Sequence, residues 1–319
     1  MTQSVVERMR MRKFIIEDGV FGKRLILTSN WSDNYLYSIP VDEIKEIDLN
    51  HENGWCDKDI SFLKHFSFLE SLEILTVDIE DFSPIYRFKT LKNLSLPYLV
   101  KTEFDFTELP ELESCFLDWW PGARSIFQVK TLKKLYIYSY MPTNTDDFAQ
   151  LTHLENLEFG NGPLTNLEGL SALKKLDSLA LFCFRRLEDL HGIEALTNLE
   201  FLRIDFCKKI QKIDAVRDLL NLKQLHILNC GDIESIKPIE KLVNLRDLMI
   251  SEGTRIRDYD VTPILKLSRL QRLDLTDNKK YQHQLKDFKA YYGSPEALKL
   301  YKEECGISHE DPPHWENLI

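Results

Sequence analysis

The sequence predicts an α/β solenoid, in which short repeats stack side by side into a curved horseshoe. Two observations lead to this prediction. The pattern Leu-x-x-Leu-x-Leu, with another apolar residue at some places, recurs along most of the chain at intervals of 19 to 25 residues. Between the copies, apolar residues recur at every third position. A repeat of this length cannot bury its own apolar face, so neighbouring copies must stack to form one core.

The most regular copies lie in the second half of the chain and predict parallel strands. They begin at Leu176, Leu199, Leu222, Leu245 and Leu270. Alternate residues of a strand face opposite sides of a sheet, so the second and third apolar residues of each copy point into the core. Stacked copies then give a parallel sheet on the inner side of the horseshoe.

The same frame extends towards the N-terminus in less regular copies. These begin at Leu154, Leu132, Leu112, Leu91 and Leu72, and a degenerate first copy is Ile44, Ile47 and Leu49. In the copy that begins at Leu72, we expect Leu75 and Val77 to be the second and third core residues. About eleven strands are therefore expected.

The second half of each repeat predicts short helical turns. Ile210, Ile213, Val216 and Leu219 show the three-residue apolar step. This step suits short helical or 3₁₀ turns, one side of which covers the strand layer. The turns are expected on the outer side of the horseshoe.

The two ends of a solenoid need caps, and the sequence offers both. Residues 1–43 are interpreted as a β-rich N-terminal cap, with apolar segments at 14–16, 25–27 and 35–37. Residues 44–278 hold the repeats. Residues 279–319 are interpreted as a helical C-terminal cap and tail, with helices over 284–292 and 295–305.

These copies resemble the leucine-rich-repeat family over residues 72–278, and most closely its 22 to 23-residue type, found in bacterial internalins and phosphatase-regulating proteins. The resemblance implies a curved solenoid that binds proteins. In this family the ninth position of a repeat usually holds Asn or Cys. Cys207, Cys230 and Asn278 match this pattern, whereas Trp120, Tyr140, Gly162, Phe184 and Gly253 depart from it.

Composition narrows the class of partner. The formal net charge is −10, which argues against a general affinity for nucleic acid or for anionic membranes. No stretch reaches the roughly 18 apolar residues of a membrane helix, and no signal-like apolar run follows the first residues. The six cysteines form no Cys-x-x-Cys pair. We expect a soluble cytoplasmic protein with a neutral or basic protein partner.

The sequence lacks the common motifs of nucleotide-binding, hydrolase and metal sites. It contains no phosphate-binding glycine loop and no Gly-x-Ser-x-Gly. His309 and His314 are five residues apart, and Pro312 and Pro313 exclude the helix that would align them on a metal. We expect no catalytic residue, no metal and no cofactor.

The inner face of the sheet is the candidate binding surface. It would carry the aromatic residues Phe116, Tyr136, Tyr138, Phe182 and Phe201 and the acidic residues Asp118, Glu158, Asp205 and Asp247, all open to solvent. Exposed strands tolerate such residues, and acids keep a solenoid soluble. The rings fall on successive copies, however, which favours a binding surface. His226 is expected to lie on the same inner face of the sheet, with its side chain exposed at the surface.

The sequence therefore predicts a non-catalytic, protein-binding scaffold whose partner has a basic patch. A dedicated inhibitor, an immunity protein that neutralises a toxin, and an adaptor all remain open. The alternative is a secreted or surface effector that binds a host or neighbour-cell protein. The sequence does not indicate the oligomeric state.

Overall fold

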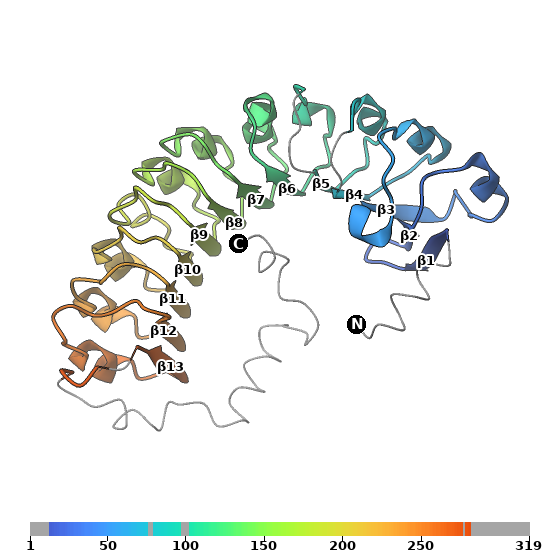
Figure 1. Ribbon diagram of the computed structural model, residues 1–319. Coiled ribbons are helices and arrows are strands. Elements are labelled where there is room, and N and C mark those ends of the chain that lie inside the picture. Colours follow the sequence, from blue (N-terminus) through green and yellow to red (C-terminus); the bar gives the residue numbers. More distant parts are fainter. Residues whose placement is uncertain (1–12, 76–78, 97–101, 277, 282–319) are drawn as a thin grey trace.

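The computed structural model describes residues 13–75, 79–96, 102–276 and 278–281. The described residues form an arc whose inner side is lined by one 13-stranded sheet, and the turns between strands lie on its outer side (Figure 1). The strands follow one another in the sheet in chain order. This is the predicted curved solenoid.

The strands are β1 (Phe14–Asp18), β2 (Lys23–Leu27), β3 (Ile44–Asn50), β4 (Ser71–Leu75), β5 (Asn93–Ser95), β6 (Ser114–Asp118), β7 (Lys134–Tyr138), β8 (Asn156–Gly160), β9 (Ser178–Phe182), β10 (Phe201–Asp205), β11 (Gln224–Leu228), β12 (Asp247–Ser251) and β13 (Arg272–Leu275). The 3₁₀ helices are η1 (Asp33–Tyr37), η2 (His51–Asn53), η3 (Ser61–His65), η4 (Ser83–Arg87), η5 (Phe106–Glu108), η6 (Pro121–Gln128), η7 (Asp146–Gln150), η8 (Glu168–Ala172), η9 (Asp214–Asp218), η10 (Lys237–Lys241) and η11 (Thr262–Lys266).

From β3 to β13, the parallel strands confirm the expected repeats. Leu202 lies opposite Leu179 on one side and Leu225 on the other, so equivalent residues of successive copies form ladders. In the half-repeats, 3₁₀ helices turn apolar side chains inward, as Val216 of η9 does. The prediction of short outer turns over an inner parallel sheet is confirmed.

The N-terminal end begins with a hairpin. β1 and β2 pair antiparallel, and β2 pairs parallel with β3, so the hairpin continues the sheet and covers the first repeat. The third apolar segment of the expected β-rich cap, residues 35–37, lies in the 3₁₀ helix η1 rather than in a strand. The expected helices over 284–292 and 295–305 lie outside the described residues.

The structure corrects the frame of one copy. Leu72 pairs with Ile47 and with Leu94, which are both second core residues, so the copy begins at Leu69 rather than at Leu72. Ile74 is its third core residue and is fully buried, whereas Leu75 is only half-buried. The predicted frame was wrong by three residues, and any odd shift exchanges the two faces of a strand. Val77 lies outside the described residues.

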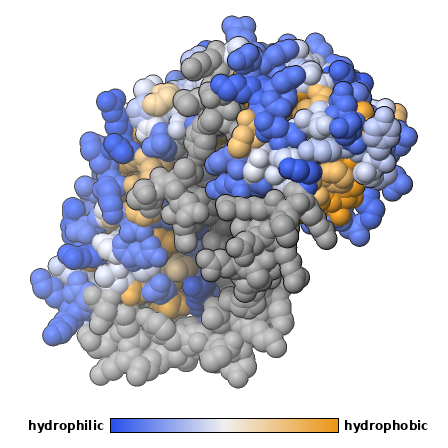
Figure 2. Space-filling view, turned by 45° about the vertical axis from the view of Figure 1, so that its right-hand side comes forward, coloured by the Kyte–Doolittle hydropathy of each residue, from blue (hydrophilic) through white to orange (hydrophobic). Residues whose placement is uncertain are grey.

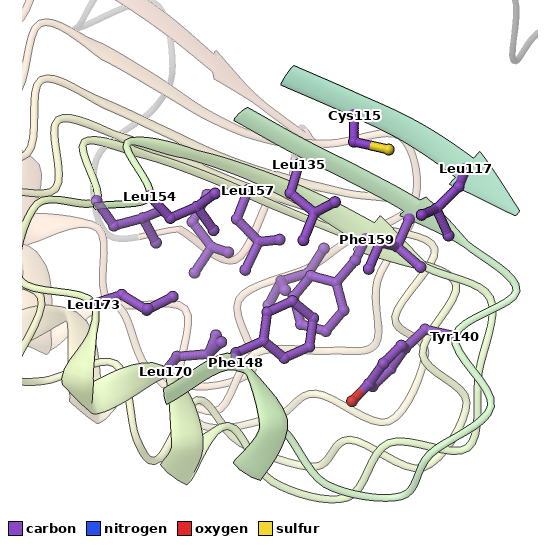
Figure 3. Packing of buried hydrophobic residues seen from close by; sticks show 14 of the residues in the cluster. Cys115, Leu117, Leu135, Tyr140, Phe148, Leu154, Leu157, Phe159, Leu170 and Leu173 are labelled. Carbon is purple, nitrogen blue, oxygen red and sulfur yellow. The ribbon is translucent and has the colours of Figure 1, made fainter. Parts of the chain in front are cut away.

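The core is a continuous column of buried apolar side chains between the sheet and the outer turns. In its middle, aromatic rings fill the space behind β7 and β8, and Tyr140, Phe148 and Phe159 point towards one another (Figure 3). Their ring centroids are 5.1 to 5.7 Å apart. These contacts tie two consecutive repeats together.

At the ninth position of a repeat, the side chain of Asn usually forms hydrogen bonds with backbone groups of the turn. In this chain, large side chains form such bonds instead. Tyr140 is buried and its hydroxyl donates to the carbonyl oxygen of Asn144 at 3.0 Å. The indole nitrogen of Trp120 donates to the carbonyl oxygen of Thr102 at 2.8 Å. Buried backbone groups need such partners, so these departures from the family pattern still satisfy the turn.

The thiols at the ninth position are structural as well. Cys230 is buried and its sulfur donates to the carbonyl oxygen of Leu228 at 3.2 Å. Burial raises the pKa of Cys230 to about 12 and raises the pKa of Cys207 further. A thiol that stays protonated is a poor nucleophile, so neither residue is suited to thiolate chemistry.

Candidate functional site

The inner face is formed by the third, fifth and seventh residues of each copy. In the described part of β3 to β13 and the residue after it, these positions hold eight acidic and three basic residues. The acidic ones are Glu46, Asp48, Glu73, Asp118, Glu158, Asp205, Asp247 and Asp274, and the basic ones are Lys134, Arg203 and Arg272. The excess of acidic residues makes the inner face acidic overall. On the side of the molecule that Figure 2 shows, hydrophilic residues predominate and apolar residues form separate patches.

All five predicted aromatic residues lie on the inner face and are half-buried. They are Phe116, Tyr136, Tyr138, Phe182 and Phe201. Side chains that are neither buried nor fully exposed offer ring surface to a partner while their neighbours hold them in place. The structure therefore places the five rings on the face that the sequence predicts, and each keeps part of its surface exposed.

The rings form two groups rather than one continuous band. The first group consists of Phe116, Tyr136 and Tyr138 on β6 and β7. The rings of Phe116 and Tyr138 lie 5.4 Å apart, and Tyr136 pairs with Phe116 in the register of the two strands. Further along the sheet, the guanidinium of Arg203 lies over the ring of Phe182 at 5.4 Å. The ring of Phe201 meets His226 edge-on at 5.5 Å. A cation–π contact and an edge-on contact thus position the second group.

Glu158 links the first group of rings to the next strand. The hydroxyl of Tyr138 donates to Oε1 of Glu158 at 2.6 Å. Burial raises the pKa of Glu158, although the bond from Tyr138 and the charge of Arg203 partly oppose the rise. Burial and the charge of Glu158 also raise the pKa of Tyr136. The site therefore holds a carboxylate that lacks full solvation.

Asp118, beside the same rings, is in a similar state. Burial raises its pKa, and a hydrogen bond with Ser139 only partly opposes this. Its Oδ1 atom accepts no hydrogen bond and has no contact with solvent. An unmade hydrogen bond of this kind costs free energy.

Two predicted surface carboxylates are buried instead. Asp205 is only 2% exposed and accepts from Nη2 of Arg203 at 2.8 Å. Asp247 is 1% exposed, with Nε2 of His226 at 3.2 Å and Nη1 of Arg272 at 3.7 Å. His226 is itself buried, so the expectation of three exposed side chains was wrong. Side chains of the same strand and of adjacent strands thus cover one another on the inner face, and His226 reaches Asp247 diagonally.

Two acidic residues of the first copies lie on the inner face without having been predicted as site residues. Asp48 and Glu73 lie on the inner face, where Nη2 of Arg24 contacts them at 3.0 Å and 3.3 Å. Glu73 was hidden by the wrong frame of its copy, and the register of Leu72 with Leu94 is the signal that reveals it. These two carboxylates are already paired with a cation of the same chain.

We expect Glu158→Gln to raise the free energy of unfolding at neutral pH by about 0.5 to 1 kcal/mol, the size usual for improving a partly solvated charge. A carboxyl whose pKa is raised by folding stabilises the fold at low pH, and this contribution is lost as the pH rises through the raised pKa. The gain of the variant should therefore disappear towards pH 4. Urea unfolding between pH 4 and pH 8 measures this, with the exposed Glu234→Gln as the control. An equal gain at both ends of the range would contradict the assignment.

The described residues contain no group of three or more His, Cys, Asp and Glu side chains placed to hold a metal ion. None of the helices described is long and apolar enough to cross a membrane.

No family model matches the chain, and no curated protein matches its sequence. Solved structures do. An internalin, InlF from Listeria monocytogenes, is 25% identical with a TM-score of 0.60, over 74% of this chain and 68% of that one. A chain of the PEPR1–AtPEP1 structure is 16% identical with a TM-score of 0.50, over 80% of this chain and 41% of that one. Together with the repeat sequence and the parallel sheet, these likenesses identify the chain as a leucine-rich-repeat solenoid.

Proposed function

We propose that the chain is a non-catalytic scaffold that binds another protein through its inner face. The observation that carries this proposal is the set of five half-buried rings on β6, β7, β9 and β10. Aromatic residues supply large contact areas at a low entropic cost, and they are enriched among the residues that dominate binding energies. The centre of the inner face is the proposed contact surface.

The charge of the same face supports a partner with a basic patch. The eight acidic and three basic positions given above leave an excess of negative charge on the inner face. Complementary charge speeds association and disfavours acidic partners. The fold is compatible with this proposal, since PEPR1, which shares it, was solved with AtPEP1.

The role of such a scaffold is that of a dedicated inhibitor, an immunity protein that neutralises a toxin, or an adaptor, and the place of action that we propose is the cytoplasm. A toxin gene beside the gene for this chain would favour immunity. The alternative is a secreted or surface effector, which the likeness to an internalin favours. Recovery of the protein from culture medium without cell lysis would support the effector.

A pull-down from the native lysate tests the inner face. Tyr136→Ala and Phe182→Ala together remove one ring from each group, and we expect them to reduce recovery of the bound protein roughly tenfold or more. The matched control is Leu265→Ala in η11, which removes an exposed apolar side chain on the outer side. Circular dichroism checks that each variant is folded. Unchanged recovery with the double variant would exclude the rings as the contact surface.

A further inference from the structure

The acids of the inner face differ in whether the chain supplies a cation for them. Asp48 and Glu73 contact Arg24, Asp205 contacts Arg203, and Asp247 contacts His226 and Arg272. Glu46 accepts from the backbone nitrogen of Phe21, and Asp274 accepts from the hydroxyl of Ser251. Asp118 and Glu158 have no ion pair among the described residues. Four of the eight acids, Glu46, Asp118, Glu158 and Asp274, therefore have no counter-ion among the described residues, and two of them, Asp118 and Glu158, lie in the middle of the sheet.

These two acids are also the ones beside the first group of rings. In the register of β6, β7 and β8, Phe116 pairs with Tyr136, and Tyr136 pairs with Glu158. In the next row, Asp118 pairs with Tyr138, whose hydroxyl donates to Glu158. The two carboxylates thus lie on opposite sides of Tyr138. Three strands bring rings and unpaired negative charge together within about 10 Å across the sheet.

We propose that this site, on β6 to β8, takes a lysine or arginine side chain of the protein partner, with its cationic group against Glu158 and within the field of Asp118. Its methylene stem lies on the rings of Phe116 and Tyr136. This inference rests on the proposed function, because it assumes a protein on the inner face. It adds which part of the partner docks there and which residues hold it.

A cationic side chain fits the site better than the other two classes of occupant. An apolar side chain would cover two carboxylates without giving them a counter-charge, which is costly in a partly desolvated place. An acidic one would be repelled by both. A cation gains from the carboxylates and from the faces of the rings, and its long stem packs on them.

The site is built before the partner arrives. Tyr138 holds Glu158 through a hydrogen bond, and the ring of Tyr138 is held in turn by Phe116. Side chains fixed in the free protein lose less entropy on binding. The charge of the nearby Arg203 acts on Glu158 from a distance, but its guanidinium is held by Asp205 and by the ring of Phe182.

Binding of Nα-acetyl-arginine amide and its lysine analogue tests the site without knowledge of the partner. The side-chain carboxyl signals of Glu158 and Asp118 are followed by NMR, in about 150 mM salt so that long-range attraction is screened. We expect saturable shifts of both signals with dissociation constants below about 50 mM. The norleucine amide, which has the stem without the charge, should shift neither signal.

Variants distinguish binding at this site from attraction by the overall negative charge of the inner face. Glu158→Gln should weaken binding of the arginine amide by roughly fivefold or more, and Asp118→Asn should weaken it less, because it acts over a longer distance. Glu73→Gln is the matched control, since it removes the same charge from the same face but from a carboxylate that Arg24 already pairs. Its affinity for the arginine amide should equal that of the wild type.

Three results would overturn the inference: no saturable shift, equal shifts with the norleucine amide, or an equal loss in Glu158→Gln and Glu73→Gln. If any of these occurs while the Tyr136 and Phe182 variant still loses the partner, the binding face stands and the cation site is wrong. If the arginine amide binds as expected but the ring variant keeps its partner, the cation site stands and the proposed contact face is wrong.

Discussion

Replacing Phe159 by alanine is expected to lower the free energy of unfolding by about 4 kcal/mol. Phe159 is completely buried, and its ring lies 5.7 Å from Tyr140, 5.1 Å from Phe148 and 5.0 Å from Phe184. Its neighbours come from the repeats before and after its own and are themselves buried, so they cannot collapse into the space that is left. In a solenoid, contacts between neighbouring repeats carry much of the stability.

Guanidinium chloride unfolding, followed by circular dichroism, measures this loss. The control is Tyr37→Ala, which removes a ring that is 91% exposed and should change the free energy of unfolding by less than about 0.5 kcal/mol. A loss for Phe159→Ala as small as that of the control would mean that the rings behind β8 do not form one packed cluster.

The repeat ladder was predictable because its signal is local. Alternation within five or six residues identifies the core side of a strand, and the distance to the next copy aligns the ladders. Leu202 and Ile204 lie opposite Leu179 and Leu181, as the pattern predicts. The half-repeats carry an equally local three-residue step, and most of them contain a 3₁₀ helix, although the one between β9 and β10 does not.

The copy near Leu72 shows where local pattern fails. Leu72, Leu75 and Val77 fit the motif as well as Leu69, Leu72 and Ile74 do. Only the partner strands decide between the two frames, because Leu72 must lie opposite Leu94. Register is a property of the pair of strands, so one strand read alone does not determine it.

The burial of Asp205, His226 and Asp247 was unpredictable for a related reason. Position on the strand places each side chain on the inner face, which the structure bears out. How much of it remains exposed depends on diagonal neighbours in the adjacent repeats, such as Phe201 against His226. Those neighbours are 20 or more residues away in sequence, and no periodic pattern records their size.

The ninth position of the repeat at β8 provides a sharp test of how neighbouring turns fit together. Gly162 stands where the family usually has Asn or Cys, and the preceding repeat has Tyr140 at the same position. A Cβ atom on Gly162 would overlap with the backbone carbonyl oxygen of Tyr140. The backbone of Gly162 is not left-handed, so close approach rather than backbone conformation explains the glycine.

We therefore expect Gly162→Ala to lower the free energy of unfolding by about 3 kcal/mol, since the carbonyl group is part of a packed turn and cannot move aside cheaply. Gly253→Ala is the matched comparison at the ninth position of another repeat. There a Cβ atom meets nothing within 4 Å, but the φ angle of +96° is unfavourable for alanine. That strain alone should cost about 1 kcal/mol. Chemical unfolding of both variants ranks the two effects. A smaller loss for Gly162→Ala than for Gly253→Ala would show that the turns that follow β7 and β8 can move apart at little cost.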